Sequence, residues 1–164
     1  MKYIYIGKIV NTHGIKGEIR LLSNFKYKEK VFKKEMTIYI GKDKIKETIN
    51  SYRHHKQFEM ITLNGYTNIN EVLKYMKEKV YINEEDLILE KDEYLDSDLL
   101  NLEVYTNNKY VGKIERIEDY KTYKLIIVKN EEKNFIIPYV NDIIEQIDFK
   151  EKKIVIKYIK GLLD

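Results

Sequence analysis

The 164-residue chain contains no cysteine, no tryptophan and no alanine, and its single proline is Pro138. Without cysteine it forms neither disulfides nor thiolate metal sites. Because alanine is the strongest helix former, its absence disfavours a helical bundle. The chain also lacks an apolar run of the roughly 18 residues that a membrane span needs, and it shows no signal-peptide core. We therefore expect a cytoplasmic protein that does not bind a membrane.

Isoleucine and valine are abundant instead, with 25 and nine residues. Since β-branched residues prefer strands, this composition favours a mainly β fold. Hydrophobic residues make up 43% of the chain, which is enough for a core and argues against general disorder. Alternation of apolar and polar residues predicts strands at 3–10, 15–22, 36–40, 45–52, 58–63, 80–82, 102–106, 112–118, 123–129, 134–138 and 153–158.

One segment has the pattern of an amphipathic helix. In Ile69–Lys79 the apolar residues recur at helical spacing, and Asn68 with Glu71 has the spacing of a capping box. A shorter helical turn is predicted near Asn141–Ile147. Turn-forming residues at 41–44, 64–65 and 107–108 separate neighbouring strands. These elements predict a small β-barrel covered by one helix, followed by a second β unit.

Charge is distributed unevenly along the chain. Residues 1–56 carry 14 Lys and Arg against five Asp and Glu, whereas residues 57–90 and 91–164 each carry a small negative excess. A basic region of this kind is typical of a surface that binds a polyanion, although a solvated lysine-rich surface has the same composition. The change to acidic composition over 83–98 marks a domain junction, so we expect domains at 1–90 and 91–164.

The most distinctive motif opens the chain, at Ile6–Arg20. Gly14 and Gly17 can adopt positive φ and therefore suit the turn of a hairpin. His13, Lys16 and Arg20 would then lie on or beside one loop, where cations and exposed amides can contact phosphates.

This opening block resembles the N-terminal signature of the RimM family of bacterial ribosome maturation factors. The second half resembles the PRC-barrel domain that follows in that family, and the resemblance covers nearly the whole chain. The segments that carry it are Gly7–Val10, His13–Glu18, Arg53-His54, Gly112–Ile114, Phe135–Val140, Ile147-Asp148 and Gly161–Asp164. The resemblance implies two small β-barrels, an N-terminal translation-factor-like barrel with one helix at 1–90 and a C-terminal PRC barrel at 91–164.

The family also implies a function. We expect a non-enzymatic, monomeric assembly factor without a cofactor or metal, which binds immature 30S subunits and promotes maturation of the head and 16S rRNA processing. Residues expected to contact rRNA are His13, Gly14, Lys16, Gly17, Arg20, Arg53 and Lys56. The expected protein partner is the small-subunit head ribosomal protein nineteen, with contacts from Tyr94, Leu95, Asp98 and Leu99.

The junction departs from the family pattern, which has two adjacent aromatics and then an Asp-Leu-x-Gly turn. Here Leu95 replaces the second aromatic and Asn101 replaces the glycine. Asparagine tolerates the left-handed region, so we expect the turn to persist. Tyr94, Leu95 and Leu99 could equally pack at the seam between the domains.

Other classes of function are less well supported. His54 and His55 are adjacent on a predicted strand and would face opposite ways, which is poor geometry for a metal site. Gly14 and Gly17 lie in a hairpin rather than at a strand-to-helix turn, so they form no nucleotide-binding loop. The main alternative hypothesis to the assembly factor is a PRC-barrel adaptor that binds a non-ribosomal protein assembly. A nuclease is the third hypothesis.

Overall fold

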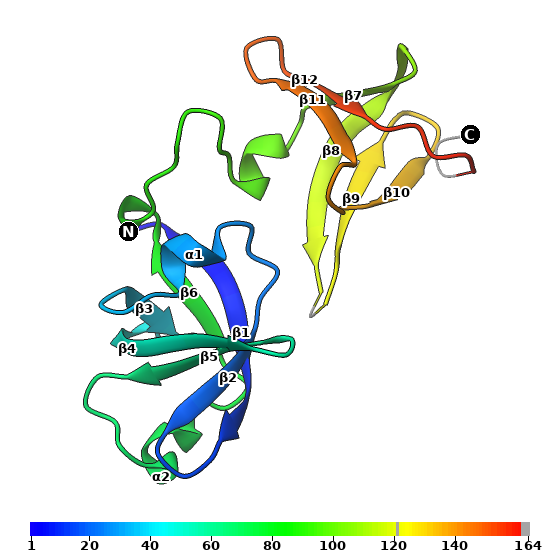
Figure 1. Ribbon diagram of the computed structural model, residues 1–164. Helices are drawn as coiled ribbons and strands as arrows, with labels where there is room; N and C mark the ends of the chain where they lie inside the picture. The colour runs from blue at the N-terminus through cyan, green and yellow to red at the C-terminus, as the bar shows by residue number, and fades with distance from the viewer. Residues whose placement is uncertain (121, 162–164) are drawn as a thin grey trace. The chain divides into compact units, whose positions relative to one another are not determined.

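The computed structural model describes residues 1–120 and 122–161. The chain divides into two compact units, Met1–Glu90 and Lys91–Asp164, and each has its own sheet (Figure 1). Each unit also has its own hydrophobic core. The last part of the family's closing motif, residues 162–164, lies outside the described residues. Within the described ranges, no helix is long and apolar enough to span a membrane.

The first unit is a closed barrel with the strand order β1-β2-β5-β4-β3-β6. Its strands are β1 (Tyr3–His13), β2 (Glu18–Leu22), β3 (Thr37–Ile40), β4 (Ile45–His55), β5 (Phe58–Leu63) and β6 (Lys79–Asn83). The register of β1 shifts once against β6 and once against β2. Such bulges bend a strand, which lets β1 pair with neighbours on both sides and close the barrel.

The segment after β2, residues 25–34, is rich in lysine and is anchored by its apolar residues. It contains the short helix α1 (Lys28–Val31), and Tyr27, Val31 and Phe32 are all buried. The Phe32 ring stacks on Tyr52 of β4, with 5.9 Å between centroids. The segment is therefore part of the barrel core, while its lysines remain on the surface or half-buried.

The predicted helix at 69–79 is shorter than expected. It consists of α2 (Ile69–Val72) and a 3-10 turn, η1 (Leu73–Tyr75). The capping box is confirmed, since the Glu71 backbone N–H donates to the Asn68 side chain at 3.3 Å. The helix stops because Met76 is extended and Lys77 has a φ of +66°, which directs the chain into β6.

The second unit is a six-stranded sheet with the order β10-β9-β8-β7-β12-β11. Its strands are β7 (Glu103–Thr106), β8 (Lys109–Asp119), β9 (Lys124–Lys129), β10 (Asn134–Pro138), β11 (Ile144–Asp148) and β12 (Lys153–Ile156). β12 and β7 are parallel, and the other pairs are antiparallel. The mainly β prediction is confirmed. The helical turn predicted near Asn141–Ile147 is wrong, because Asn141 and Asp142 form a non-helical turn and the chain from Ile144 onward pairs with β12 as strand β11.

Asparagines form two turns of the second unit where the sequence predicts them. Asn107 and Asn108 both have positive φ and connect β7 to β8 through a two-residue hairpin loop. Asn101, which stands where the family has glycine, adopts a φ of +68°. Two 3-10 turns flank the junction, η2 (Glu84–Asp86) in the first unit and η3 (Asp96–Leu99) in the second. The expected backbone of the Asp98–Asn101 turn is thus retained.

Candidate nucleic-acid interface

Several predicted RNA-contacting residues lie on the outer face of β2, β5 and β4. Arg20 of β2 pairs in register with Met60 of β5, and Met60, which is completely buried, pairs with Arg53 of β4. The neighbouring row, which includes Ile19 and Ile61, belongs to the core. Because side chains alternate along a strand, the row from Arg20 to Arg53 points away from the barrel interior.

Arg20 is held by two rings. Its Nη2 lies 2.6 Å from His13 Nδ1, and its guanidinium carbon lies 5.3 Å from the centroid of the Phe58 ring. Since an arginine only donates, His13 Nδ1 accepts, which leaves the ring N–H at Nε2. The Arg20 Nε is buried and has no hydrogen-bond partner. The guanidinium is thus fixed in orientation while one of its donors remains unsatisfied.

Arg53 forms a bidentate ion pair with Glu18. Its Nη2 and Nε donate to the two Glu18 carboxylate oxygens at 2.7 and 2.9 Å. The hydrogen bond from Arg53 lowers the pKa of Glu18, and the charges of Arg53 and Arg20 lower it further. Glu18 therefore stays ionised in the midst of cations and fixes Arg53 beside β2.

His55 at the end of β4 joins the same group, which the sequence did not indicate. Its ring lies 6.4 Å from that of His13. Partial burial lowers the pKa of His55, and the nearby charges of Lys56, Arg53 and Arg20 add to this effect. The local field is therefore positive despite Glu18. We call His13, Lys16, Arg20, Arg53, His55 and Lys56 the basic face.

The β1–β2 loop presents Lys16 beside this face. Gly14 and Gly17 have φ of +69° and +93°, as the turn requires. The Ile69 backbone N–H donates to Ile15 O at 2.9 Å, which fixes the loop against the start of α2. A pocket of about 410 Å³ lies here, lined by His13, Gly14, Ile15, Lys16, Glu18 and Thr62. Lys56 is exposed at the tip of the β4–β5 hairpin.

The two adjacent histidines do face opposite ways. His55 lies near His13, whereas His54 Nδ1 is 2.8 Å from Glu59 Oε1. Glu59 is only 1% exposed and also accepts from the Tyr52 hydroxyl at 2.7 Å. His54 thus belongs to a polar network at the barrel wall, and the pair does not converge on one point.

The four residues expected to bind a protein partner have local structural roles. Tyr94 packs against the core of the second unit, with its ring 5.7 Å from Phe149. Asp98 accepts a hydrogen bond from the Leu95 backbone N–H at 2.8 Å and so closes the η3 turn. Leu99 is completely buried, which corrects the expectation that it contacts a partner. Tyr94 and Leu95 remain half-exposed.

Charged groups are partly buried beside Tyr94. Lys124 Nζ lies 2.6 Å from Asp96 Oδ2, and the Lys124 side chain is 10% exposed. Burial raises the pKa of the Tyr139 hydroxyl, and the charge of Asp96 raises it further. This cluster fixes the start of η3 against β9, so the half-exposed Tyr94 sits on a rigid support.

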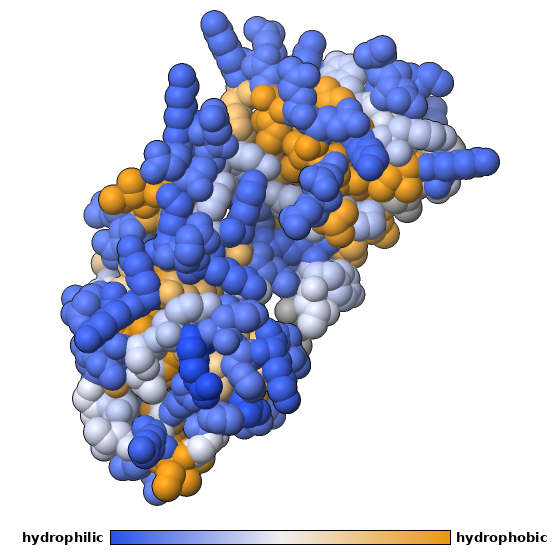
Figure 2. Space-filling view, viewed as in Figure 1, coloured by the Kyte–Doolittle hydropathy of each residue, from blue (hydrophilic) through white to orange (hydrophobic). Residues whose placement is uncertain are grey.

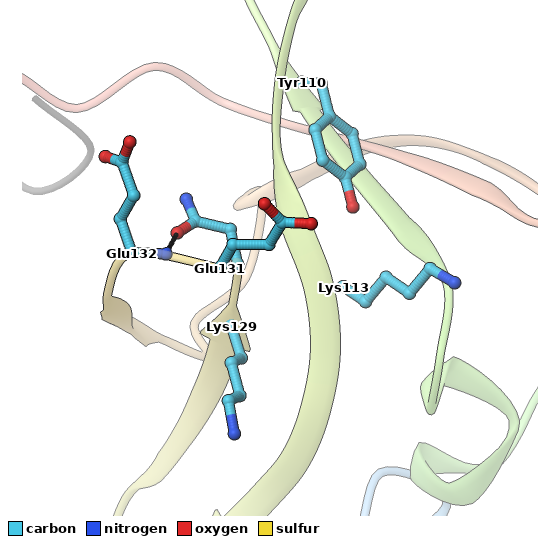
Figure 3. Close-up of a pocket in the computed structure, with 6 residues that line it drawn as sticks. Tyr110, Lys113, Lys129, Glu131 and Glu132 are labelled. Atoms are coloured by element: carbon cyan, nitrogen blue, oxygen red, sulfur yellow. Dashed lines mark hydrogen bonds between the residues drawn. The ribbon is translucent and has the colours of Figure 1, made fainter.

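An open pocket of about 630 Å³ lies elsewhere on the second unit (Figure 3). It is lined by Tyr110, Lys113, Lys129, Asn130, Glu131 and Glu132. In Figure 3 the Lys129 side chain extends away from the loop that carries the two glutamates. Because its charges are mixed in sign, the pocket favours no particular class of ligand.

Comparison with known proteins agrees with this organisation. The RimM N-terminal domain model matches residues 4–87, and the RimM PRC barrel domain model matches residues 96–162. Curated relatives named Ribosome maturation factor RimM occur in Exiguobacterium (34% identity, 100% of this chain and 98% of the relative) and Finegoldia magna (35%, 99% and 100%). A third, from Staphylococcus haemolyticus, is 36% identical over 98% of this chain and 99% of its own length. With both domains matched in order and relatives aligned from end to end, the chain belongs to the RimM family.

Proposed function

We propose that this protein is a cytoplasmic, non-enzymatic assembly factor that binds immature 30S ribosomal subunits and promotes maturation of the head and 16S rRNA processing. The observation that carries the proposal is the end-to-end similarity to proteins named Ribosome maturation factor RimM. The protein would act through binding energy alone. A factor that binds one conformation of the nascent head more tightly shifts the population toward it by that difference in affinity.

The basic face supports the rRNA-binding part of the proposal. Arg20 is oriented by His13 and Phe58 and keeps a donor that is not satisfied within the protein. Because this Nε is buried, a phosphate would contact the outer nitrogens of the guanidinium, and exposed Lys16 and Lys56 would add long-range attraction. Gly14 and Gly17 shape the loop and so let the loop backbone approach the rRNA closely.

The surface around Tyr94 supports the protein-binding part. A half-exposed aromatic residue that is held by a packed neighbour resembles the anchors that contribute most energy to interfaces. We propose that Tyr94 and Leu95 contact the small-subunit head ribosomal protein nineteen, with Asp98 and Leu99 shaping the turn behind them.

Sedimentation of lysate on a sucrose gradient tests the proposal. We expect the protein on free small subunits enriched in precursor 16S rRNA, and not on whole ribosomes. Presence only at the top of the gradient, even at low salt, would disprove the assembly-factor role and favour the adaptor. Incubation of the purified protein with precursor rRNA and divalent metal examines the nuclease alternative, for which we expect no cleavage.

Charge reversal tests which surface is responsible. Lys16→Glu with Arg20→Glu should weaken subunit binding by at least about tenfold at low salt and reduce the slope of affinity against salt concentration by about two. The matched control is Lys109→Glu with Lys157→Glu, two exposed lysines of the second unit with the same change of net charge. Equal losses in both double variants would mean that overall charge, not the basic face, governs binding.

A further inference from the structure

Four tyrosines form a continuous row on a different part of the barrel surface. In register, Tyr5 of β1 pairs with Tyr81 of β6, and Tyr81 pairs with Tyr39 of β3. Tyr3 lies two residues before Tyr5, on the same side of the strand. The alternate residues of these strands, including Ile38, Ile40 and Ile82, belong to the core, so the tyrosines point outward. We call Tyr3, Tyr5, Tyr39 and Tyr81 the tyrosine ladder.

The rings of the ladder support one another edge to face. The centroid distances are 5.1 Å for Tyr3–Tyr39, 6.3 Å for Tyr3–Tyr81 and 5.9 Å for Tyr5–Tyr81, with interplanar angles between 66° and 71°. Tyr39 is 8% exposed and forms the base, whereas Tyr3 is 36% exposed. An edge-to-face contact with a neighbouring ring fixes the orientation of a tyrosine ring. The π face of that ring is then presented along the barrel surface.

Lysines lie over these ring faces. Lys44 Nζ is 4.3 Å from the centroid of Tyr81 and 5.5 Å from that of Tyr3, and Lys79 Nζ is 6.0 Å from Tyr5. Lys46 pairs in register with Tyr39 and is exposed. The other register partner on this face is neutral Asn83, opposite Tyr3. The face therefore combines electron-rich rings with cations, and none of these positions is acidic.

The combination fits one chemical class of ligand better than others. An unpaired nucleotide has a flat base that stacks on an aromatic ring and a phosphate that pairs with an ammonium. The Lys44 ammonium already occupies the Tyr81 face, so a base could take its place while the ammonium moves to the adjoining phosphate. An acidic peptide would engage the lysines but would leave the ring faces unused. Bases within a duplex cannot offer their faces.

We propose that the tyrosine ladder is a stacking site for single-stranded RNA, separate from the basic face. In the closed barrel β6 lies across from β5, so the two surfaces are carried by opposite walls. The inference rests on the proposed function for the source of the strand, an unpaired segment of immature 16S rRNA. The chemistry of the site is testable without ribosomes.

The test compares a ligand that has bases with one that has none. The intact chain is titrated with a short fluorescent oligoadenylate and, in parallel, with inorganic polyphosphate. Tyr81→Leu removes the ring and keeps an apolar side chain, and we expect it to raise the Kd for oligoadenylate about tenfold while leaving the Kd for polyphosphate within about twofold. Tyr81→Phe should restore oligoadenylate binding, because stacking needs the ring and not the hydroxyl.

Two further variants keep the test decisive. Tyr3→Leu removes the most exposed ring near the chain start and should weaken oligoadenylate binding even if Tyr81→Leu perturbs folding. Tyr110→Leu, at a 52% exposed tyrosine of the second unit, is the matched control and should have no effect. Equal weakening of both ligands by the ladder variants, or no weakening of oligoadenylate, would overturn the inference.

The outcome is independent of the sedimentation experiment. If the protein sediments with small subunits but the ladder variants weaken both ligands equally, or do not weaken oligoadenylate binding, only the ladder is disproved. A protein that binds oligoadenylate through Tyr81 but never sediments with subunits would disprove only the proposed function.

Discussion

The two units use the same number of strands for different surfaces. The first closes its strands into a barrel, whereas the second is a six-stranded sheet with one parallel pair of strands. The first carries 17 Lys and Arg against 12 Asp and Glu, and the second carries 13 against 15. The first places arginines, histidines and tyrosines in rows across paired strands. Since both are small β units, we propose that surface chemistry, rather than fold, would make the first a polyanion-binding module and the second a protein-binding one.

The predicted binding residues also behave differently in the two units. In the first, the hairpin register brings His13, Arg20 and Arg53 onto one outer face with Glu18 between them. In the second, Leu99 lies in the core and Asp98 closes a turn. The first surface is therefore a group of side chains acting together, whereas the second reduces to Tyr94 and Leu95 on a rigid support.

The largest expected effect tests whether the units are energetically separate. Phe32 is 2% exposed in the first core and Ile154 is fully buried in the second, and the two cores share no residue. Phe32→Ala should cost about 3–5 kcal/mol and Ile154→Ala about 2–5 kcal/mol. In calorimetry, each should lower the melting temperature of one transition only. A single transition that both variants shift equally would show that the units unfold together.

An intermediate effect tests the protein-binding side of the comparison. Tyr94→Ala should reduce capture of ribosomal protein nineteen about tenfold or more and cost about 1–2 kcal/mol of stability, because the side chain is only partly buried. Tyr123→Ala, at a 53% exposed tyrosine of the same unit, is the control and should leave capture unchanged. Cooperative unfolding has to persist in Tyr94→Ala. A variant that unfolds would instead identify Tyr94 as a packing residue.

Local patterns predicted most of the fold. The strands follow from alternation, and the turns follow from residues that tolerate positive φ, as at Asn107 and Asn108. The errors arose where tertiary pairing decided the outcome. The isoleucines around β11 have a spacing that fits a helix and a strand equally, and pairing with β12 made it a strand.

The site was harder to predict, because it depends on register between distant strands. His13 and Arg20 are close in sequence and share a hairpin, so their contact was foreseeable. His55 approaches His13 only because β4 and β2 both pair with β5. The tyrosine ladder depends on β1 pairing with β6 near the end of the unit. Sequence alternation shows that a tyrosine faces outward, but it does not show which strand lies beside it.

The smallest expected effect measures the electrostatic difference between the units directly. Partial burial and the charges of Lys56, Arg53 and Arg20 keep the pKa of folded His55 below its usual value. At a pH between the folded pKa and the usual histidine pKa, the unfolded chain therefore binds more protons at this residue than the folded chain does. This contribution to stability is present above the usual histidine pKa and is lost as pH falls through the folded pKa.

An NMR titration should show that the pKa of His55 rises in Arg53→Gln, which removes one cation. Polyphosphate should raise it too, because an anion on the basic face favours the imidazolium, whereas Lys109→Glu in the second unit should leave it unchanged. If neither Arg53→Gln nor polyphosphate changes the pKa of His55, the first unit has no concentrated positive field at this face.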